Sequence, residues 1–549
     1  MSNIDWIILT VTLTSIIIYG IYKSRTSKDL DGYFLSNRDM PWYLVLLSIM
    51  GTQASAITFL SAPGQAYTDG MRFVQYYFGL PLAMIVICIV FVPVFNRLKI
   101  YTAYEFLENR FDLKTRTLTS LLFQVSRGLS TGISIYAPSI ILSSLLGWNI
   151  YITNVIMGGM LIIYTVSGGA RAVAHTQKLQ LIIVFAGMFI AGYLVVHFMP
   201  EHVGLVKALH IGGQNGKMNI ITSGRNANGF DWKDKYNIWS GVIGGFFLAL
   251  SYFGTDQSQV GRYLTAQNNK QSKMGLLMNG LVKVPMQFLI LLLGVLVFSF
   301  YQFHKSPVYF NETQIARAKK TPFKDSLISI ENAYAKVDSH DVKDEKKIKT
   351  EYKNLLTKAL PGEDVNDTNY IFLRFVLDYL PVGLVGLLIA VIFLSAWGSI
   401  AAALNALASC TVVDIHKKFI RKDLTPKEDY RISQLYTFAW GIFSILVAEF
   451  ASNLGNSLIE TVNILGSLFY GVILGIFLVA FWFRQIKANA IFYASLIAEI
   501  FVIAIYRANI VSFLWLNVVG ALLVIFFGYA IQLFLKNKAD NSIETEANK

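Results

Sequence analysis

The chain has 549 residues, of which 54% are hydrophobic and only 15% are charged, and its formal net charge is +13. Soluble domains average about 25% charged residues, so this composition excludes an ordinary soluble protein. No phosphate-binding loop, zinc-type cluster or nucleophile motif is visible in the sequence, which argues against an enzyme.

Apolar segments long enough to cross a bilayer recur along the whole chain, since each has about 20 residues. We predict about thirteen membrane-spanning helices. They lie near residues 5–22, 42–62, 75–97, 118–145, 149–167, 177–199, 237–256, 274–302, 382–413, 434–452, 458–483, 488–506 and 511–535. The first segment lacks a basic leader and a small-residue cleavage site, so we interpret it as a retained helix.

The second segment is interrupted by residues 51–67, which read GTQASAITFLSAPGQAY. Backbone groups freed in hydrocarbon are tolerated where they line a cavity or find other partners. Broken spans are therefore the best sequence pointer to the binding site of a transporter. A kinked but complete helix is the alternative, because Gly and Pro are ordinary in membrane spans.

Ionisable residues inside predicted spans are costly and point to function. Arg127 lies about ten residues into its span, roughly 15 Å deep, and its guanidinium suits a substrate carboxylate. A structural pairing of Arg127 with a buried carbonyl or carboxylate is the alternative. Lys283 is equally deep, so we expect an internal partner. Asp256 is predicted to be a helix-end or gate residue, and Glu499 stays unassigned.

Residues 304–378 form a long polar stretch without a catalytic signature. Its middle, Lys336 to Leu360, is predicted to form a charged surface helix. We place the stretch outside the membrane on the outer face, because loops longer than about 60 residues translocate regardless of their charge.

Ser395 and Ser399 are four positions apart in the ninth predicted span, so they share one face of a helix. Sodium is a hard cation that takes oxygen ligands, as calcium and magnesium do. Hydroxyl groups on this face, opposite carbonyl groups freed by a broken helix, would supply such ligands. An ordinary helix-packing seam of small residues is the alternative.

Basic residues cluster in alternate short loops, near residues 23–38, 97–116, 171–178, 262–273, 417–427, 484–487 and 536–538. The positive-inside rule places these loops in the cytoplasm. With an odd number of spans, the N-terminus lies outside and the C-terminus inside. The net positive charge thus reflects membrane topology, and we expect no nucleic-acid partner.

Several motifs, in this order, resemble the sodium/solute symporter family. They are QASAITFLSAPGQAYTDGMRF, VFVPVFNRLKIYTAYEFLENRF, GISIYAPSIILSSLLGWNI, YTVSGGARAVAHTQKLQ, TDQSQVGRYLTAQNNKQSKMG and LNALASCTVVDIHKKFI. The wording SAITFLSAPGQAY and IYAPSIIL is most similar to the branch that carries iodide, vitamins and monocarboxylates.

The resemblance implies an all-α, LeuT-like fold with two inverted five-helix repeats. The implied parts are residues 1–41 (extra helix and loop), 42–199 (first repeat), 200–236 (outer loop), 237–483 (second repeat with the insert 304–378) and 484–549 (two helices and a cytoplasmic tail). The first helix of each repeat would be broken, within GTQAS and within YFGTDQ.

The resemblance also implies a sodium site. Its ligands would be the backbone carbonyl groups of Gly51, Ala54 and Ser395, together with side chains at positions 398 and 399. Ser399 keeps the hydroxyl group, but Gly398 stands where the family commonly has serine, so one ligand is missing.

A second departure from the family pattern is Gln177, which stands where relatives usually have aspartate. That aspartate belongs to an additional sodium site in some members. Because both the acid and a hydroxyl group are missing, we predict one coupled sodium ion.

Four positions match solute-contacting or gate positions of sugar-carrying relatives: Thr58, Tyr77, Tyr252 and Lys283. Tyr252 resembles an inner aromatic gate. The carboxylate and the asparagine that help to hold a sugar are replaced by Tyr77 and Ala249. Arg127 and Lys283 together favour an organic anion.

We therefore expect a sodium-coupled symporter that imports a small organic anion or sugar-like solute by alternating access across the cytoplasmic membrane. Its partners would be sodium, the solute and the lipid bilayer, and it would be a monomer or weak oligomer. A proton-coupled or uncoupled carrier of the same fold, or a transporter-like sensor, is the alternative.

Overall fold

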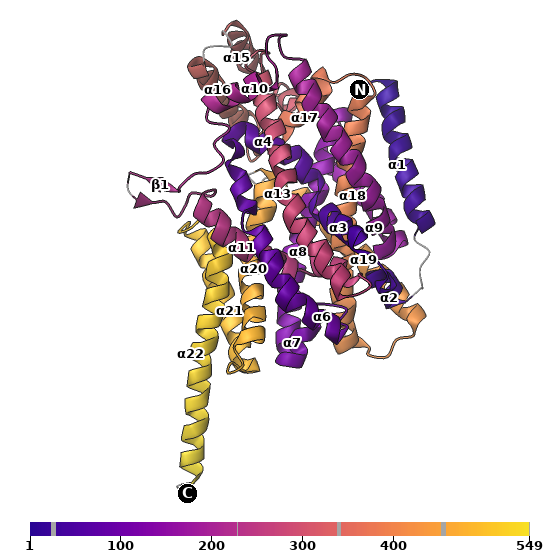
Figure 1. Cartoon of the computed structure of the whole chain (residues 1–549). Helices are drawn as coiled ribbons and strands as arrows, with labels where there is room; N and C mark the ends of the chain where they lie inside the picture. Colours follow the sequence, from indigo (N-terminus) through magenta and orange to yellow (C-terminus); the bar gives the residue numbers. More distant parts are fainter. Residues whose placement is uncertain (24–28, 228, 338–341, 452–456, 548–549) are drawn as a thin grey trace.

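The computed structural model describes residues 1–23, 29–227, 229–337, 342–451 and 457–547 (Figure 1). Residues 24–28 of the first predicted basic loop lie outside this description. The described chain is helical apart from loops and one two-stranded antiparallel sheet, β1 (Arg225–Asn226) and β2 (Gly229–Phe230). The predicted all-α class is confirmed.

Helices of the first half are α1 (Asn3–Lys23), α2 (Leu30–Leu35), η1 (Ser36–Arg38), α3 (Trp42–Gln53), α4 (Ala56–Asp69), η2 (Met71–Tyr77), α5 (Leu80–Val86), η3 (Ile87–Phe91), α6 (Val92–Leu98), α7 (Glu105–Arg110), α8 (Leu113–Leu146), α9 (Ile150–His197) and α10 (Leu205–Gln214). Helices of the second half are η4 (Ser240–Gly244), α11 (Gly245–Gly254), α12 (Gln257–Leu264), α13 (Asn269–Phe300), α14 (Glu312–Ala318), α15 (Lys324–Lys336), α16 (Val342–Ala359), η5 (Thr368–Tyr370), α17 (Ile371–Tyr379), α18 (Leu384–Cys410), η6 (Thr411–Ile420), α19 (Pro426–Phe450), α20 (Leu458–Trp482), α21 (Ala488–Arg507) and α22 (Phe513–Ala547).

In the described part of the chain, ten helices are long and apolar enough to cross a membrane, or eleven if the bent pair α3 and α4 is one span. Two shorter apolar stretches, Ile150–Val166 and Ser240–Gly254, fall on the two remaining predicted segments. The chain is therefore a multi-pass membrane protein. The number of thirteen crossings stays a prediction, because length and composition alone do not establish that the two short stretches span.

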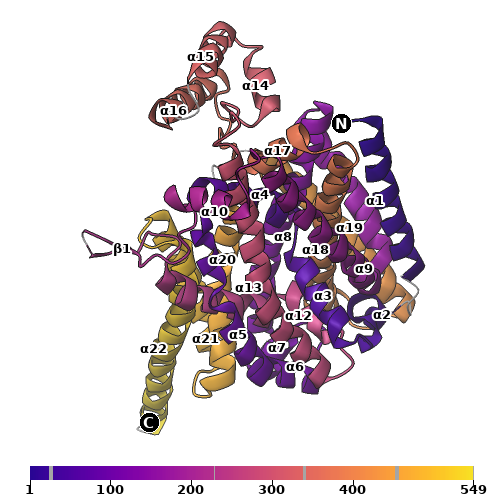
Figure 2. The same cartoon turned by 45° about the horizontal axis from the view of Figure 1, so that its top comes forward.

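The two termini lie at opposite ends of the helix bundle, and the insert lies at the end that carries the N-terminus (Figures 1 and 2). This agrees with the predicted relative sidedness of the N-terminus, the insert and the C-terminus. Which end faces the outside stays a prediction.

Two helices of the bundle are broken. The first break, Ala54 and Ser55, separates α3 from α4, whose axes differ by 59°. The second break, Thr255 and Asp256, separates α11 from α12. Both breaks fall within the predicted sequences GTQAS and YFGTDQ, so the kinked but complete helix is not the outcome at either place.

The helix α18 lies at the centre of the bundle, because the apolar span Leu384–Ile420, which contains it, is 89% buried. Its sequence is rich in Ala and Gly, which lets neighbouring backbones approach closely in a membrane bundle. It packs against α9, α8 and α1, and it also touches α3 and α4 on either side of the first break. This packing holds Ser395 and Ser399 at a fixed place beside that break.

The insert is a small helical unit with a core of its own, separate from the main bundle (Figure 2). Tyr309, Leu327, Tyr352 and Leu356 are its most deeply buried large side chains. The predicted surface helix corresponds to α16, and positions 338–341 of that prediction lie outside the described residues. The helices α14 and α15 were not predicted.

Candidate solute and sodium site

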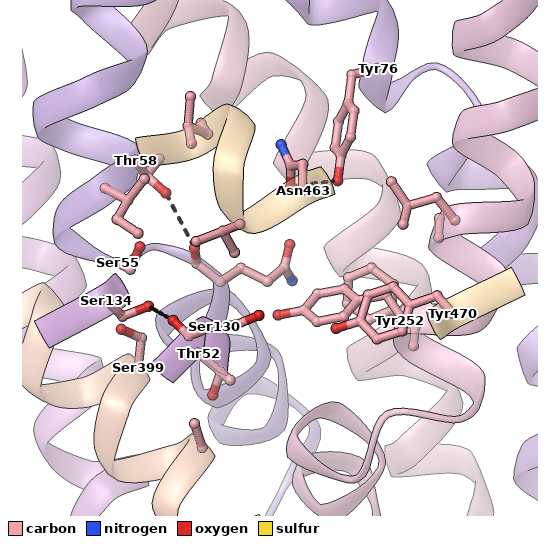
Figure 3. Close-up of a pocket in the computed structure, with 18 of the residues that line it drawn as sticks. Thr52, Ser55, Thr58, Tyr76, Ser130, Ser134, Tyr252, Ser399, Asn463 and Tyr470 are labelled. Carbon is pink, nitrogen blue, oxygen red and sulfur yellow. Dashed lines mark hydrogen bonds between the residues drawn. The ribbon is translucent and has the colours of Figure 1, made fainter. Parts of the chain in front are cut away.

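A cavity of about 140 Å³, here called the central pocket, lies beside the first break. Side chains from α3, α4, η2, α5, α8, α11, α13, α18 and α20 line it. Hydroxyl groups of Thr52, Ser55, Ser130, Ser134 and Ser399 gather on one side, and Tyr76, Tyr252 and Tyr470 lie on the opposite side (Figure 3). The pocket thus offers a hydrogen-bonding wall and an aromatic wall to one solute.

All five residues that the sequence assigns to the solute line this pocket. They are Thr58, Tyr77, Arg127, Tyr252 and Lys283. Of the five residues assigned to sodium, Ser399 lines it as well, whereas Gly51, Ala54, Ser395 and Gly398 are not among its lining residues.

Arg127 has a carboxylate neighbour inside the protein. Its Nε atom lies 3.8 Å from Oδ2 of Asp256, and its terminal nitrogen donates to Oγ of Ser258 and, at 3.5 Å, to the hydroxyl group of Tyr252. The Nε atom has no hydrogen-bond partner among the described residues. The structural pairing is therefore present in this conformation, and the same guanidinium group also faces the pocket.

Asp256 stabilises the second break. Its Oδ1 atom accepts hydrogen bonds from the backbone nitrogen of Ser258 at 2.7 Å and from its hydroxyl group at 2.6 Å. Its Oδ2 atom accepts from the hydroxyl group of Tyr470 at 2.7 Å. Asp256 is thus the N-cap of α12, which agrees with the predicted helix-end role.

Lys283 is buried, with 2% of its surface exposed. Its ammonium group lies 5.7 Å from the ring centre of Tyr77, so its internal neighbour is an aromatic face. Among the described residues, no carboxylate oxygen lies within 4.0 Å of it. The pocket lining contains two basic residues and no acidic one.

The first break frees two backbone carbonyl groups from the helical pattern. The nitrogen of Ser55 donates to the carbonyl group of Gln53 at 3.0 Å and not to that of Gly51, its helical partner. Likewise, the nitrogen of Thr58 donates to the carbonyl group of Ser55 at 3.0 Å and not to that of Ala54. The oxygens of Gly51 and Ala54 therefore keep lone pairs for another partner.

The two serines of α18 use their hydroxyl groups differently. Ser399 faces the pocket and donates to the carbonyl group of Ala396 at 3.0 Å, which leaves its oxygen free to accept or to bind a cation. Ser395 donates to the carbonyl groups of Val391 and Ile392, both at 2.9 Å, and does not reach the pocket.

The sequence reasoning missed several polar residues of the pocket. Ser130, Thr131 and Ser134 lie on α8 three, four and seven positions after Arg127, which is the spacing of one helix face, and this spacing was a signal that could have identified them. On the opposite side, the hydroxyl group of Tyr76 donates to Asn463 at 3.0 Å. That pair had no sequence signal, because its members lie far apart in the chain.

The bundle with a broken helix beside a polar central pocket defines the class of secondary membrane transporters. A sequence profile of the sodium:solute symporter family matches residues 33–320 and 350–498, and the chain belongs to this family. Members of this family are transporters, and the chain is a sodium-coupled solute transporter of the membrane.

Individual relatives are similar over most of the chain. The sodium/sialic acid symporter SiaT of Proteus mirabilis is 25% identical over 96% of this chain and 94% of its own length. The sodium-coupled monocarboxylate transporter 1 of Xenopus laevis is 27% identical over 86% of this chain and 67% of its own length. The human sodium/iodide cotransporter, at 26% identity, covers 83% of this chain and 62% of its own length.

Among solved structures, a substrate-bound, outward-open Na+-coupled sialic acid symporter superposes with a TM-score of 0.78 at 23% identity. The match covers 97% of this chain and 98% of the other. It confirms the predicted LeuT-like fold.

Proposed function

We propose that this chain imports a small organic anion together with one sodium ion by alternating access. The observation that carries the proposal is the charge of the central pocket, whose lining has Arg127 and Lys283 and no acidic residue. Asp256, which does not line the pocket, offsets part of the charge of Arg127. Lys283 has no carboxylate beside it among the described residues. A monoanion would neutralise the remaining charge.

The volume of the pocket favours a small solute. At about 140 Å³ it is close to an engineered cavity of about 150 Å³ that holds benzene. A monocarboxylate of about six to eight non-hydrogen atoms fits this space, with its carboxylate at Arg127 and Lys283. A hydroxyl or keto group of such a solute would face Ser130, Ser134 and Thr58, while Tyr77 and Tyr252 cover it as aromatic walls.

For sodium, we propose the carbonyl groups of Gly51, Ala54 and Ser395 and the hydroxyl group of Ser399. The freed carbonyl groups at the first break support this assignment, since a hard cation prefers such oxygens. Gly398 supplies no side chain. External sodium would hold the broken helix against α18 and so order the solute site beside it.

Coupling one sodium ion to a monoanion moves no net charge. Such a cycle would lose the membrane-potential contribution of about 2.3 kcal/mol per charge per 100 mV and depend on the sodium gradient alone. Uptake of a neutral solute by the same cycle would carry an inward current.

We further propose that residues 42–199 and 237–483 are the two inverted repeats. Residues 1–41, 200–236, the insert 304–378 and 484–549 would be additions to them, with the N-terminus outside and the C-terminus inside. We also propose that the chain works as a monomer or weak oligomer and has no nucleic-acid partner.

The test is a panel of solutes that are scored by sodium-dependent thermal stabilisation of the purified protein. We expect small hydroxy- and keto-monocarboxylates to stabilise it more than sialic acid, and neutral sugars least. A preference for a neutral sugar would contradict the assignment of an anion.

The specific alternative is a proton-coupled or uncoupled carrier, which the departures at Gln177 and Gly398 favour. Uptake into proteoliposomes that is equally fast with sodium and with potassium would support this alternative and contradict symport.

A further inference from the structure

The side chain of Gln177 joins three helices at one buried point. Its Nε2 atom donates to the carbonyl group of Gly398 on α18 at 3.1 Å and to the hydroxyl group of Thr52 on α3 at 3.3 Å. Its Oε1 atom accepts from the hydroxyl group of Ser48 on α3 at 2.9 Å. Gln177 itself lies on α9 and is fully buried, so its amide connects α3, α9 and α18.

The packing around this amide depends on two glycines. A Cβ atom at Gly51 would lie 2.8 Å from Cγ of Gln177. A Cβ atom at Gly398 would lie 3.1 Å from the same Cγ atom and 2.6 Å from Oε1 of Gln180. Contacts below 3.0 Å require something to move, so the missing side chains at positions 51 and 398 make the room that the amide occupies.

The two N–H groups of the Gln177 amide determine what can bind at the junction of α3, α9 and α18. Apart from Gln177, the groups that converge here are the carbonyl oxygen of Gly398 and the hydroxyl groups of Thr52 and Ser48. The hydroxyl group of Ser48 donates to Gln177 and that of Thr52 donates to the carbonyl group of Ser48, whereas the oxygens of Gly398 and Thr52 can accept from a donor or bind a cation. The amide group supplies two N–H donors, and it therefore leaves no demand for a cation.

We propose that the uncharged amide of Gln177 takes the place of a cation at the junction of α3, α9 and α18. Its three hydrogen bonds are called the tie below. This inference rests on the proposed function and deepens it. The junction is held in every step of the cycle without an ion, and the sodium ion at the first break is the single ion that moves with each solute. Gln177 acts as a positioning residue, because it does not line the solute pocket itself and acts through Thr52, which lines the pocket, and through its packing against Gly51.

The decisive variant is Gln177→Glu, which keeps the shape of the side chain and replaces the two donors with a carboxylate oxygen. The point would then hold five oxygens and a negative charge, which is a site for a hard cation. We expect the Hill coefficient for sodium to rise from about one to about two, since its upper limit is the number of sites. Transport of a monoanion would change from electroneutral to current-carrying.

The assay is uptake of the best monocarboxylate of the panel into proteoliposomes, with sodium flux, solute flux and current measured together. Gln287→Glu is the matched control, because Gln287 is also fully buried but lies on α13, and its amide makes no hydrogen bond among the described residues. We expect this control to keep the wild-type ratio of sodium to solute. The same rise in both variants would overturn the proposal.

A second variant, Gln177→Met, tests the tie without adding charge. It removes all three hydrogen bonds at a similar side-chain volume, so we expect a several-fold weaker apparent affinity for sodium with an unchanged ratio of sodium to solute. An unchanged affinity in Gln177→Met, or an unchanged ratio in Gln177→Glu, would overturn the tie and leave the symport proposal intact. Sodium-independent uptake by the unmodified protein would instead overturn the proposed function, and the inference with it.

Discussion

The two broken helices of the bundle differ in the chemistry of their breaks. At the first break, Ser55 is the N-cap of α4 and makes no side-chain capping bond, and the carbonyl groups of Gly51 and Ala54 are left without helical partners. At the second break, the carboxylate of Asp256 caps α12 and is contacted by Arg127 and Tyr470.

Because of this difference, the two breaks of one helix bundle can have different roles. A break whose carbonyl oxygens stay free can take up and release a cation, and its geometry can then change with each transport cycle. A break that is filled by the carboxylate of its own chain needs no ion and can anchor a guanidinium group that faces the solute. The residue type at the N-cap therefore distinguishes the first break, where carbonyl groups lack helical partners, from the second break, where a carboxylate makes the capping bond.

Asp256→Ala should have the largest effect on stability and uptake, because it removes the carboxylate that caps α12 at the second break. The substitution leaves Arg127 buried without its carboxylate, and removing one partner of a buried pair costs about 3–5 kcal/mol. We expect a strongly lowered unfolding midpoint of the detergent-solubilised protein and almost no uptake. Asp256→Asn keeps a cap acceptor and should lose less. An unchanged midpoint in Asp256→Ala would show that the pair does not hold this break.

Arg127→Ala tests whether the guanidinium group beside the second break also binds the solute. Loss of a buried charge partner costs about 2–5 kcal/mol, so we expect an affinity for monocarboxylates that is lower by a factor of roughly 100. Neutral solutes should lose much less. The matched variant Arg127→Ala/Asp256→Asn removes both charges and should recover stability without recovering anion binding. Equal loss for neutral and anionic solutes would assign Arg127 a structural role alone.

The sequence was sufficient for the fold, because the length of apolar segments and the family motifs depend on local sequence. It also located both breaks, since Gly and polar residues interrupt apolar runs there. It did not reveal that Arg127 is paired with Asp256 or that Gln177 ties α3 to α18. These contacts join residues far apart in the chain, and one sequence contains no distance information about them.

The same limit explains which site residues were found. Arg127 and Lys283 were identified because a charge inside a span is rare and costly. Ser130 and Ser134 were missed because a single hydroxyl group in a membrane helix is common and bonds to its own backbone, as Ser130 does to Ser126 at 2.9 Å. The pocket around them, and their spacing from Arg127 on one face of α8, distinguish them from other serines.

Ser399→Ala should weaken the binding of sodium at the first break. Ser399 presents a hydroxyl oxygen, whereas Ser395 is proposed to act through its backbone carbonyl group, which alanine retains. We therefore expect an apparent sodium affinity about tenfold weaker for Ser399→Ala, or about 1.4 kcal/mol, and a change within twofold for Ser395→Ala. Sodium titration of the uptake rate measures both. Equal sodium dependence in Ser399→Ala and the unmodified protein would remove the proposed ion site.

Ser55→Ala should have the smallest effect on stability, although serine is a preferred N-cap residue. Replacing a bonded N-cap residue by alanine usually costs about 1 kcal/mol, but the side chain of Ser55 makes no capping bond. Asn268→Ala is the matched control, because Asn268 caps α13 through the backbone nitrogen of Gln271 at 3.1 Å. We expect Asn268→Ala to lower the unfolding midpoint and Ser55→Ala to leave it almost unchanged. If both variants lost the same stability, the side chain of Ser55 would stabilise the first break. The proposed difference between an uncapped first break and a capped second break would then be wrong.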